Sequence, residues 1–328
     1  MWRAVAFGAL IALAAGCEDQ NVATPQAPST PARERDSGTS QGWGDPTTTR
    51  RPGVLRLGHL NVRRYFDATC DSNECGPGSF EEVVTPAQFE SRTKELALGL
   101  ARLEADVITL AEVENQACLD ALQEKLKEAG LDYPVAHLGE IGSPGSVDVG
   151  VLARGKLESV KTYRKEMPLT RDDGTKTQFT RELPEVHLTF GPNAVIVYAA
   201  HFRSKADDDP GRRLAEAKAT REIMIATAEA NTGAVVLLGG DLNDVPGSDT
   251  LTVFEEGAAL FRVAKDLPEA SQATYTFAGE PQAIDHIFTT ASRATAYVPK
   301  SANVLRDGSQ AGFAGSDHAA LYADFNLP

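Results

Sequence analysis

The sequence predicts an α/β or α+β domain with at least two layers of secondary structure over residues 53–328. Strand-like apolar runs alternate with helical patterns in the first half of this region, and strands dominate the second half. Such a pattern requires layered packing, because every sheet and helix must bury its apolar face against another element. No second linker interrupts the region, so we expect one domain.

The first expected helix has start signals and a buried face. Thr85 is suited to the N-cap, Pro86 to the first helical position and Gln88 to the third position of a capping box. Apolar side chains then recur at helical spacing, namely Phe89, Leu96, Leu100 and Leu103. This pattern predicts an amphipathic helix that packs on the sheet.

Apolar runs of strand length and two further helical patterns supply the remaining elements. Strands are expected at 54–62, 106–113, 148–154, 185–190, 193–202, 234–240, 283–290 and 318–327. One helix is expected at about 116–129, where Gly130 ends it, and another at 209–231, with Asp209 and Pro210 at its start.

The first residues, MWRAVAFGALIALAAGC, have the pattern of a secretory signal. A single basic residue, Arg3, precedes an apolar stretch from Ala4 to Ala15 that is too short to span a bilayer. The ending Ala-Ala-Gly-Cys resembles a bacterial lipoprotein signal, which makes residues 1–16 the signal peptide and Cys17 the lipidated first residue. We therefore expect an exported cell-envelope lipoprotein facing the periplasm or the exterior. A plain signal peptide cut elsewhere is the alternative.

Residues 17–52 have the composition of a flexible tether. They contain almost no aliphatic side chains and many Pro, Ser, Thr and Gly. Such a segment buries too little apolar surface to offset the entropy of ordering it. It is expected to link the lipid anchor to the folded domain.

The charge balance restricts the ways in which the chain can meet a partner. The formal net charge is −14 over 328 residues, which argues against a protein that grips nucleic acid by electrostatics alone. It does not exclude an enzyme that meets phosphate through a bound divalent cation, because the cation supplies local positive charge. Clustered acids are also the ligands that hard cations require.

An exported protein meets an oxidising compartment, where two of the cysteines can pair. Cys70 and Cys75 lie in the turn-rich stretch TCDSNECGPG, and we expect them to form a local disulfide. Metal binding is the alternative, but a structural zinc site needs about four ligands and no second cysteine pair exists. Cys118 lies on the apolar face of an expected helix and is interpreted as a core residue.

Polar residues occur repeatedly where apolar strands end, which is where open sheets place their ligands. A single such residue is usually a solvated loop acid or a structural histidine. Six such occurrences in one domain are hard to assign to chance. They involve Asn61, Glu112, His201, Asp241 with Asn243, Asp285, and Asp317 with His318.

The ordered set of motifs resembles the endonuclease/exonuclease/phosphatase superfamily, metal-dependent phosphoesterases with a DNase I-like fold. The matching blocks are LNV, LAEVEN, DVGVLAR, FTRELPEV, HFRSK, GGDLND, IDHIF and SDHAAL, which span residues 54–327. The resemblance implies a four-layer sandwich, in which two packed, mostly antiparallel β-sheets are flanked by helices. It assigns the whole of 53–328 to this domain.

By this resemblance, Glu112 is the central metal ligand, Asn61 binds metal or phosphate, and Asp317 is a metal ligand or an orienting group. Magnesium or manganese is the expected ion, with calcium as an alternative. Asp241 would orient or deprotonate the attacking water, and Asn243 would hold the water and the phosphate. A two-residue offset places both side chains on the same side of an extended segment.

The remaining roles concern the phosphate. His201 and His318 are expected to donate to its oxygens or to the leaving group, and Asp285 is the matched partner of His318. Arg181 matches a phosphate-contacting arginine in part of the family, and a surface ion pair is its alternative. Arg203, beside His201, is a further candidate, with a solvated position as the default.

Four other positions carry weaker expectations. Lys205 also flanks His201, and Asp148 is a candidate for orienting that histidine. His286 is expected to point away, because neighbouring side chains of a strand alternate faces. Ala200 stands where many family nucleases carry Asn, which leaves one phosphate-side amide missing.

The preferred interpretation is a monomeric, exported, lipid-tethered phosphodiesterase, and more specifically a nuclease acting on nucleic acid. One alternative is a small-molecule or lipid-headgroup phosphoesterase resembling those that act on sphingomyelin or inositol phosphates, towards which the acidic balance leans. The other is a non-catalytic envelope protein that keeps the fold for binding. That alternative predicts decay of the site, yet Glu112, Asp241, Asn243 and His318 are all present.

Overall fold

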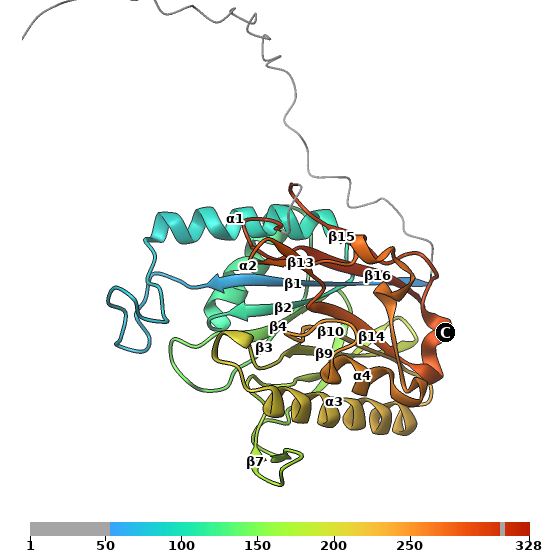
Figure 1. Cartoon of the computed structure of the whole chain (residues 1–328). Helices are drawn as coiled ribbons and strands as arrows, with labels where there is room; N and C mark the ends of the chain where they lie inside the picture. Colours follow the sequence, from blue (N-terminus) through green and yellow to red (C-terminus); the bar gives the residue numbers. More distant parts are fainter. Residues whose placement is uncertain (1–52, 309–311) are drawn as a thin grey trace, which may run out of the picture. The chain divides into compact units, whose positions relative to one another are not determined.

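The computed structural model describes residues 53–308 and 312–328 (Figure 1). The expected signal peptide 1–16, the lipidation site Cys17 and the tether 17–52 lie outside the described residues. Among the helices that the structure describes, none combines the length and the apolar character that crossing a membrane requires.

Two six-stranded mixed sheets form the centre of the domain within the described residues. The order of the first sheet is β15 (Asn303–Leu305), β16 (Ala320–Asn326), β1 (Val54–Tyr65), β2 (Val107–Val113), β4 (Asp148–Ala153) and β3 (Val135–Gly139). The order of the second is β11 (Leu260–Arg262), β14 (Asp285–Thr290), β10 (Val235–Asp241), β9 (Asn193–His201), β8 (Glu185–Phe190) and β5 (Lys156–Lys161). Among the strands that the structure describes, only β1–β2 and β9–β10 pair in parallel, so the expectation of mostly antiparallel sheets is confirmed.

Helices cover the outer face of each sheet. Helices α1 (Pro86–Leu103) and α2 (Gln116–Glu128) share one buried apolar cluster with the first sheet. Helices α3 (Pro210–Ala230) and α4 (Asp249–Glu255) share another with the second sheet. Figure 1 shows the resulting order of helices, sheet, sheet and helices. The predicted four-layer sandwich is confirmed.

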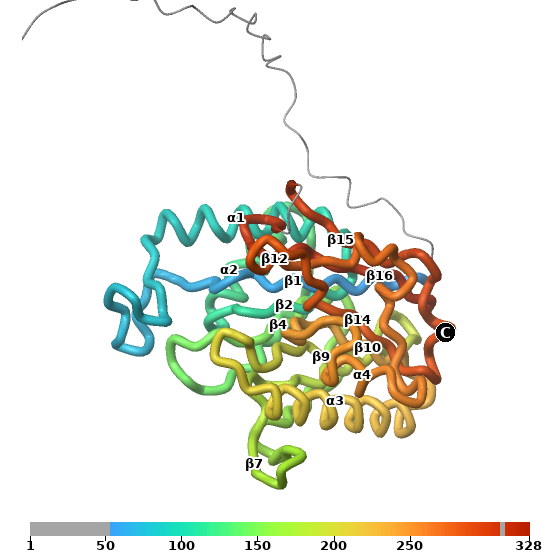
Figure 2. Tube along the Cα trace, viewed as in Figure 1, coloured from blue at the N-terminus to red at the C-terminus, as the bar shows by residue number. Residues whose placement is uncertain are grey.

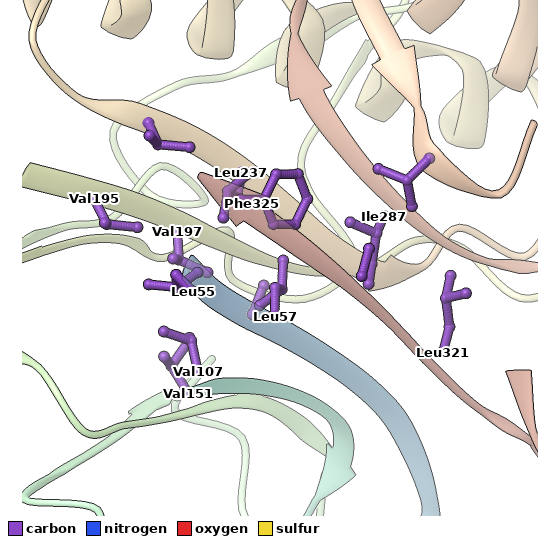
Figure 3. Packing of buried hydrophobic residues seen from close by; sticks show 14 of the residues in the cluster. Leu55, Leu57, Val107, Val151, Val195, Val197, Leu237, Ile287, Leu321 and Phe325 are labelled. Atoms are coloured by element: carbon purple, nitrogen blue, oxygen red, sulfur yellow. The ribbon is translucent and has the colours of Figure 1, made fainter. Parts of the chain in front are cut away.

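The third apolar cluster fills the space between the sheets (Figure 3). Leu55 and Leu57 of β1 and Val197 of β9 belong to it and are at most 1% exposed. Because side chains alternate along a strand, the same inward face of β1 continues to His59 and Asn61. The packing that stabilises the sandwich therefore also directs polar groups to one end of it.

Helix α1 begins as the sequence predicts. The Thr85 backbone N–H donates to Gln88 Oε1 at 2.9 Å, and Thr85 Oγ1 accepts from the Gln88 backbone N–H at 3.3 Å. The helix ends at Leu103 and is capped by Glu104, which is left-handed with φ of 50°. Leu96, Leu100 and Leu103 are fully buried, which confirms the predicted face.

Several short elements escape the sequence patterns. They are strands β3, β5, β11 and β15, helix α4, and the hairpins β6 (Leu169–Thr170) with β7 (Lys176–Thr177) and β12 (Tyr275–Phe277) with β13 (Glu280–Gln282). Short 3₁₀ turns occur at Lys205–Asp207, Glu256–Ala258, Val263–Asp266, Glu269–Ser271 and Ala291–Ala296. The last strand begins at Ala320 rather than 318, so His318 precedes it.

A buried carboxylate ties β8 to its neighbours. Glu185 is fully buried and accepts hydrogen bonds from Lys161 Nζ at 2.8 Å, Tyr198 Oη at 2.6 Å and Thr227 Oγ1 at 3.1 Å. Burial alone would raise its pKa, but donors including Lys161 and Tyr163 lower it to about 2. The folded state thus stabilises the charged form.

Replacing Glu185 by Gln should lower the free energy of unfolding at pH 7 by about 1–3 kcal/mol, because buried donors lose a charged acceptor. A depressed pKa contributes stability above the unfolded value of 4.5, and this stability is lost as the pH falls towards about 2. The difference between wild type and variant should therefore shrink from pH 7 to pH 3 in urea titrations. Glu166→Gln at an exposed position is the control. An equal loss at both pH values would exclude the charge as the cause.

Candidate active site

The structure brings the predicted site residues together at one end of the space between the sheets. In β10, Val235 and Leu237 belong to the inter-sheet core, and Asp241 continues the same face. Strand pairing sets Asp241 beside His201 of β9 and beside Asp285 of β14. The first sheet contributes its own polar strand ends to the same region.

A cleft of about 800 Å³ opens at this end of the sandwich. Its lining includes most of the predicted residues and several cationic and aromatic ones. The lining residues are Arg63, Arg64, Glu82, Glu112, His201, Ser204, Lys205, Ala206, Asp241, Asn243, Tyr275, Phe277, Gln282, Ile284, Asp317 and His318.

Asn61 links the two sheets at the base of the cleft. Its Nδ2 donates to Glu112 Oε1 at 3.1 Å and to Asp241 Oδ2 at 3.0 Å. The side chain is itself fixed, because the Arg63 backbone N–H donates to its Oδ1 at 2.9 Å. Carboxylates from different sheets therefore meet at a single amide group.

A β-bulge directs Glu112 into the cleft. The register of β2 shifts between Ala111 and Val113, and Glu112 has φ of 67°. The Arg64 backbone N–H donates to Glu112 Oε2 at 2.8 Å. Arg64 and Asn243 also have positive φ, at 45° and 52°. Left-handed non-glycine residues of this kind concentrate at functional sites, where the surrounding structure holds them.

Asp285 lies between two imidazoles. His318 Nδ1 is 2.8 Å from Asp285 Oδ2, and His59 Nε2 is 3.1 Å from Asp285 Oδ1. Burial alone would lower the pKa of His318, but the Asp285 carboxylate raises it to about 10. Burial would likewise raise the pKa of Asp285, but His318 and His59 hold it well below its usual range. His318 is therefore a cation at neutral pH.

Asp241 faces both cleft histidines without a direct hydrogen bond to either. Its Oδ2 is 3.9 Å from His201 Nε2 and 4.0 Å from His318 Nε2. Burial, together with the negative charge of Asp285, raises the pKa of Asp241 to about 7. Burial, together with the positive charge of Arg181, holds the pKa of His201 well below its usual range. The cleft thus combines a basic carboxylate, a neutral imidazole and an imidazolium.

Asn243 reaches the cleft by a route that differs from the prediction. Strand β10 ends at Asp241, and Asn243 lies beyond it in a left-handed turn. Its backbone N–H donates to Asp241 Oδ1 at 2.9 Å, and its Nδ2 donates to the Phe202 carbonyl oxygen at 3.2 Å. A turn rather than an extended segment therefore brings the two side chains together.

Two expectations for residues around His201 are wrong. Asp148 Oδ1 accepts from the Ile141 backbone N–H at 3.3 Å, while His201 Nδ1 has no hydrogen-bond partner among the described residues. Ala200 packs in the core beneath α3. A longer side chain at position 200 would therefore point away from the cleft, and alanine there removes no phosphate-side group.

The predicted cationic residues differ in position. Arg203 forms an ion pair with Asp207 in its own loop and does not line the cleft. Lys205 does line it, held by Asp244 at 2.8 Å. Arg181 is partly buried behind the lining, and its Nη1 donates to the Thr180 carbonyl oxygen at 3.4 Å.

Asp317 lies at the mouth of the cleft. It is half-exposed, and Arg63 Nε is 3.7 Å from its Oδ2. Asp317 takes no part in the hydrogen bond between Asp285 and His318, its neighbour in sequence. His286 points to the other side of β14, where its Nε2 lies 2.9 Å from the Asp244 carbonyl oxygen, as the alternation of faces predicts.

Sequence patterns missed the residues that support the site. His59 Nδ1 is 3.0 Å from Thr109 Oγ1, and both side chains are buried between the sheets. Ser316 Oγ donates to the Asn61 carbonyl oxygen at 2.7 Å and accepts from the His318 backbone N–H at 3.0 Å. The ring of Tyr275 lies 4.8 Å from that of His318. The spacing of His59 two positions before Asn61 was the one available signal.

Gly239 provides space for His59 and Thr109 between the sheets. A Cβ at this position would lie 2.4 Å from Thr109 Oγ1, so the neighbouring chain would have to shift. Gly239→Ala should therefore lower the free energy of unfolding by about 1–3 kcal/mol. Gly233→Ala, where a Cβ meets nothing within 4 Å, is the matched control. Equal melting temperatures for the two variants would show that the sheets can move apart freely here.

Oxygen donors in the cleft fit a hard divalent cation. Ligand atoms of Asp241, Asp285 and His318 lie within 4.8 Å of one another, but Asp285 and His318 already neutralise each other. Glu112, Asn61 and Asp241 remain, and two of these carry carboxylates that share one amide donor. Carboxylate oxygens are ligands that magnesium takes in proteins, and one or two of them are enough for a site.

Two packed mixed sheets flanked by helices, with a polar cleft at their strand ends, form the architecture of the DNase I-like class, whose members hydrolyse phosphoester bonds. The chain belongs to the endonuclease/exonuclease/phosphatase family, whose model matches residues 58–307. A comparison with curated protein sequences finds no significant match.

Solved structures of this class share the fold at low identity. TDP2 from D. rerio in complex with a single-strand DNA product is 19% identical, covers 84% of this chain and 99% of its own, and has a TM-score of 0.57. C. elegans TDP2 is 15% identical, with coverage of 83% and 75% and a TM-score of 0.58. The human Nocturnin catalytic domain with bound sulfate is 18% identical, with coverage of 84% and 95% and a TM-score of 0.54.

Proposed function

We propose that this protein is a divalent-metal-dependent phosphodiesterase that cleaves nucleic acid outside the cytoplasm. The observation that carries the proposal is the arrangement of Asp241 opposite His201 and His318, at 3.9 and 4.0 Å, in a cleft that also exposes Glu112. At these separations Asp241 makes no direct hydrogen bond to either imidazole, so all three groups can take partners from the cleft.

Asp241 and His318 can take opposite roles in proton transfer, because one can accept a proton at neutral pH and the other carries one. Asp241, with a pKa of about 7, is poised to accept a proton from water at neutral pH. His318 carries a proton at neutral pH, with Asp285 behind it, and can donate a hydrogen bond to a non-bridging or leaving oxygen. Neutral His201 can donate from Nε2 to a second oxygen when its partnerless Nδ1 is unprotonated.

Glu112 would hold the metal ion, with Asp317 as a further carboxylate of the cleft lining, and Asn61 would hold the Glu112 carboxylate in place. When bound, magnesium or manganese neutralises charge on the phosphate and lowers the pKa of water. Asn61 keeps Glu112 and Asp241 close together through its two hydrogen bonds. The bulge at Glu112 prevents its carboxylate from turning into the helix-facing core.

Two features favour nucleic acid as the substrate. Arg63, Arg64 and Lys205 line the cleft of a chain whose net charge is −14, so cationic side chains are available to phosphate beside the acids Glu82, Glu112, Asp241 and Asp317. The fold is also similar to that of D. rerio TDP2, which was solved with a single-strand DNA product.

The lipoprotein signal supports export and membrane attachment through Cys17. Cys17→Ser should release the chain from the membrane fraction, and retention there would exclude that anchor.

A substrate panel tests the proposal. The purified full-length chain is incubated with single-stranded DNA, plasmid DNA, RNA, bis-p-nitrophenyl phosphate, sphingomyelin and inositol phosphates, with magnesium and with EDTA. We expect EDTA-sensitive cleavage of at least one nucleic acid and of the chromogenic diester. Turnover confined to sphingomyelin or inositol phosphates would assign the alternative substrate class. Absence of all turnover, with metal shown to be bound, would identify a binding protein.

A further inference from the structure

Two aromatic side chains of the cleft lining take no part in the proton transfers assigned to Asp241 and His318. Tyr275 and Phe277 come from β12, whose hairpin with β13, labelled at β12 in Figure 2, precedes β14. They are two positions apart in one strand, so their side chains leave the same face of the hairpin. Tyr275 is the inner one, because its ring lies 4.8 Å from that of His318. Phe277 lies about 7 Å further out along the strand.

The turn of the hairpin fixes the position of Phe277. Phe277 pairs with Glu280, so the turn consists of Ala278 and Gly279. Both turn residues have positive φ, at 50° and 89°, which is typical of a two-residue type I′ turn. Because turn type and loop length set the register of a hairpin, the face that carries Phe277 is fixed.

Buried hydrogen bonds attach the hairpin to the segments that carry the site. Thr274, directly before β12, is fully buried. Its Oγ1 accepts from the backbone N–H groups of Ile284 and Asp285 at 3.2 and 3.1 Å. Its carbonyl oxygen accepts from the Ala319 backbone N–H at 2.7 Å. Because Ala319 follows His318 and Asp285 pairs with it, the hairpin is held in place relative to the imidazolium.

The Phe277 ring is open to the cleft. It is 62% exposed, more than any other large apolar side chain of the described residues. Over residues 53–308 and 312–328, no aromatic ring or cationic group packs on it. Single exposed apolar side chains are common on protein surfaces, but this one belongs to the lining of a catalytic cleft. A ring in such a place can stack on a planar part of the ligand.

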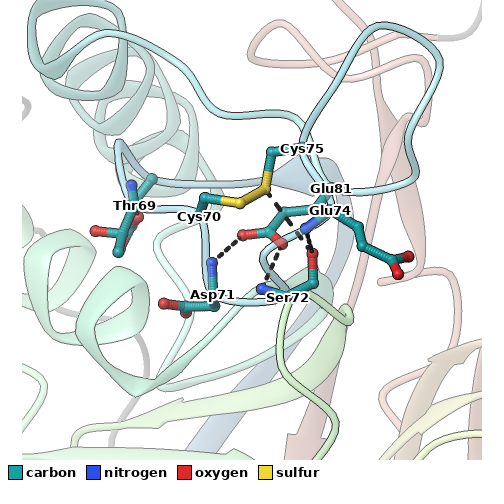
Figure 4. Close-up of a disulfide and its surroundings, with 8 residues drawn as sticks. Thr69, Cys70, Asp71, Ser72, Glu74, Cys75 and Glu81 are labelled. Carbon is teal, nitrogen blue, oxygen red and sulfur yellow. Dashed lines mark hydrogen bonds between the residues drawn. A yellow bond between two sulfur atoms is a disulfide. The ribbon is translucent and has the colours of Figure 1, made fainter.

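A second exposed ring lies in the loop between β1 and α1, in which a disulfide joins Cys70 and Cys75 (Figure 4). Phe80 of this loop is 47% exposed and does not line the cleft. The Arg64 guanidinium lies over its ring, 4.6 Å from the centroid. Phe80 therefore already has a cationic partner, unlike Phe277.

The cationic groups of the cleft need a supplement from stacking. Arg63 and Lys205 line the cleft, but each has a carboxylate neighbour, Asp317 at 3.7 Å and Asp244 at 2.8 Å respectively. Electrostatic attraction alone therefore gives a strand little affinity. Bases that stack on an aromatic ring add affinity that does not depend on charge, and single-strand binding sites combine the two contributions. Phe277 can supply the second.

A base fits the tip of the hairpin better than a lipid surface does. The neighbours of Phe277 at the tip are Ala278, Gly279 and Glu280, so the tip offers one large apolar side chain and a carboxylate. Binding to a membrane surface scales with buried apolar area and with attraction to anionic lipids. The tip has little of the first, and a chain of net charge −14 lacks the second. Stacking on a base requires only one ring face.

We propose that Phe277 is a specificity-determining residue whose ring stacks on an unpaired nucleobase, so that the cleft selects single-stranded over double-stranded nucleic acid. This inference rests on the proposed function, which places nucleic acid in the cleft. In a duplex each base is already stacked and paired, and taking it out costs free energy. An unpaired base reaches the ring without that cost.

The test measures binding, so it does not depend on turnover. The parent is the full-length chain with Cys17→Ser and Asp241→Asn, in magnesium, which carries no lipid and cleaves slowly. Fluorescence anisotropy gives its Kd for oligo-dT, for an abasic strand of the same length and for a duplex. We expect oligo-dT to bind about ten-fold more tightly than either. Adding Phe277→Ala should weaken oligo-dT binding about ten-fold and leave binding of the abasic strand unchanged.

Two further variants serve as controls. Phe277→Trp keeps an aromatic face and should retain the affinity for oligo-dT. Leu157→Ala removes an exposed apolar side chain outside the cleft lining and should change none of the three Kd values. Because Phe277 is largely exposed, its Ala variant is expected to fold, and an unchanged melting temperature checks this.

The outcomes separate this inference from the proposed function. Equal affinity of the parent for oligo-dT and the abasic strand, or equal weakening of both by Phe277→Ala, would overturn base stacking. Equal affinity for oligo-dT and duplex would overturn the selectivity. Binding of the parent to sphingomyelin vesicles that Phe277→Ala abolishes, without an effect on oligo-dT, would assign the ring to lipid instead. Base-dependent binding in a chain that hydrolyses no phosphoester would support the inference and contradict the proposed function.

Discussion

Replacing Asp241 by Asn should lower the rate of phosphodiester hydrolysis by about three orders of magnitude, within the range that a positioned general base contributes. Asn has nearly the same shape as Asp but cannot accept a proton. The buried Asp241 carboxylate, with its pKa raised to about 7, is the strongest base facing the cleft from β10. The measurement is kcat for bis-p-nitrophenyl phosphate at saturating magnesium.

The matched control for this variant is Asp249→Asn, at an exposed position in the first turn of α4. It should keep wild-type activity. Far-UV circular dichroism and the melting temperature show whether the Asp241 variant remains folded. If its kcat stays within ten-fold of wild type while magnesium still binds, Asp241 does not activate water.

The second large effect concerns His318 and Asp285. His318→Gln removes the proton donor and should lower kcat by about 10²- to 10³-fold at every pH. Asp285 acts through His318, whose pKa it raises to about 10. Without the carboxylate, His318 should lose its proton at a much lower pH. Relative to wild type, Asp285→Asn should therefore lose less activity at pH 6 than at pH 9.

The pH profile separates these roles. A positioning role that is purely structural predicts the same loss at pH 6 and at pH 9 in the Asp285 variant. The electrostatic role predicts that the alkaline limb of the profile moves to lower pH in that variant alone. His318→Gln should not recover at low pH, because no imidazole remains to be protonated.

Much of the fold follows from local sequence. The capping box at Thr85 and the apolar face of α1 depend on residues within one helix, so they are readable without tertiary information. The sequence patterns missed strands β3 and β5, because local residues do not mark them as strands. Lys156–Lys161 is mostly exposed at a sheet edge, and its polar residues give no apolar run. The partner strand β8, rather than intrinsic pattern, makes it a strand.

Sequence patterns predicted those site residues that stand at the ends of apolar strands. Asp241 and Asn61 were found this way, because alternation carries the inward face of each strand to its end. His59 and Thr109 were not, because their importance comes from contacts between two sheets. The left-handed turn at Asn243 could not be predicted from the sequence either, because it depends on hydrogen bonds to Asp241 and Phe202.

The most direct test compares the cleavage rate of a single-stranded oligonucleotide by wild type and Glu112→Gln, in magnesium, in EDTA, and after magnesium is restored. Wild type should lose its activity in EDTA and regain it with magnesium, while Glu112→Gln should be at least about 10²-fold slower than wild type whenever magnesium is present. Cleavage that survives EDTA, or a Glu112→Gln variant as fast as wild type, would show that this cleft is not a metal-dependent phosphodiesterase centre.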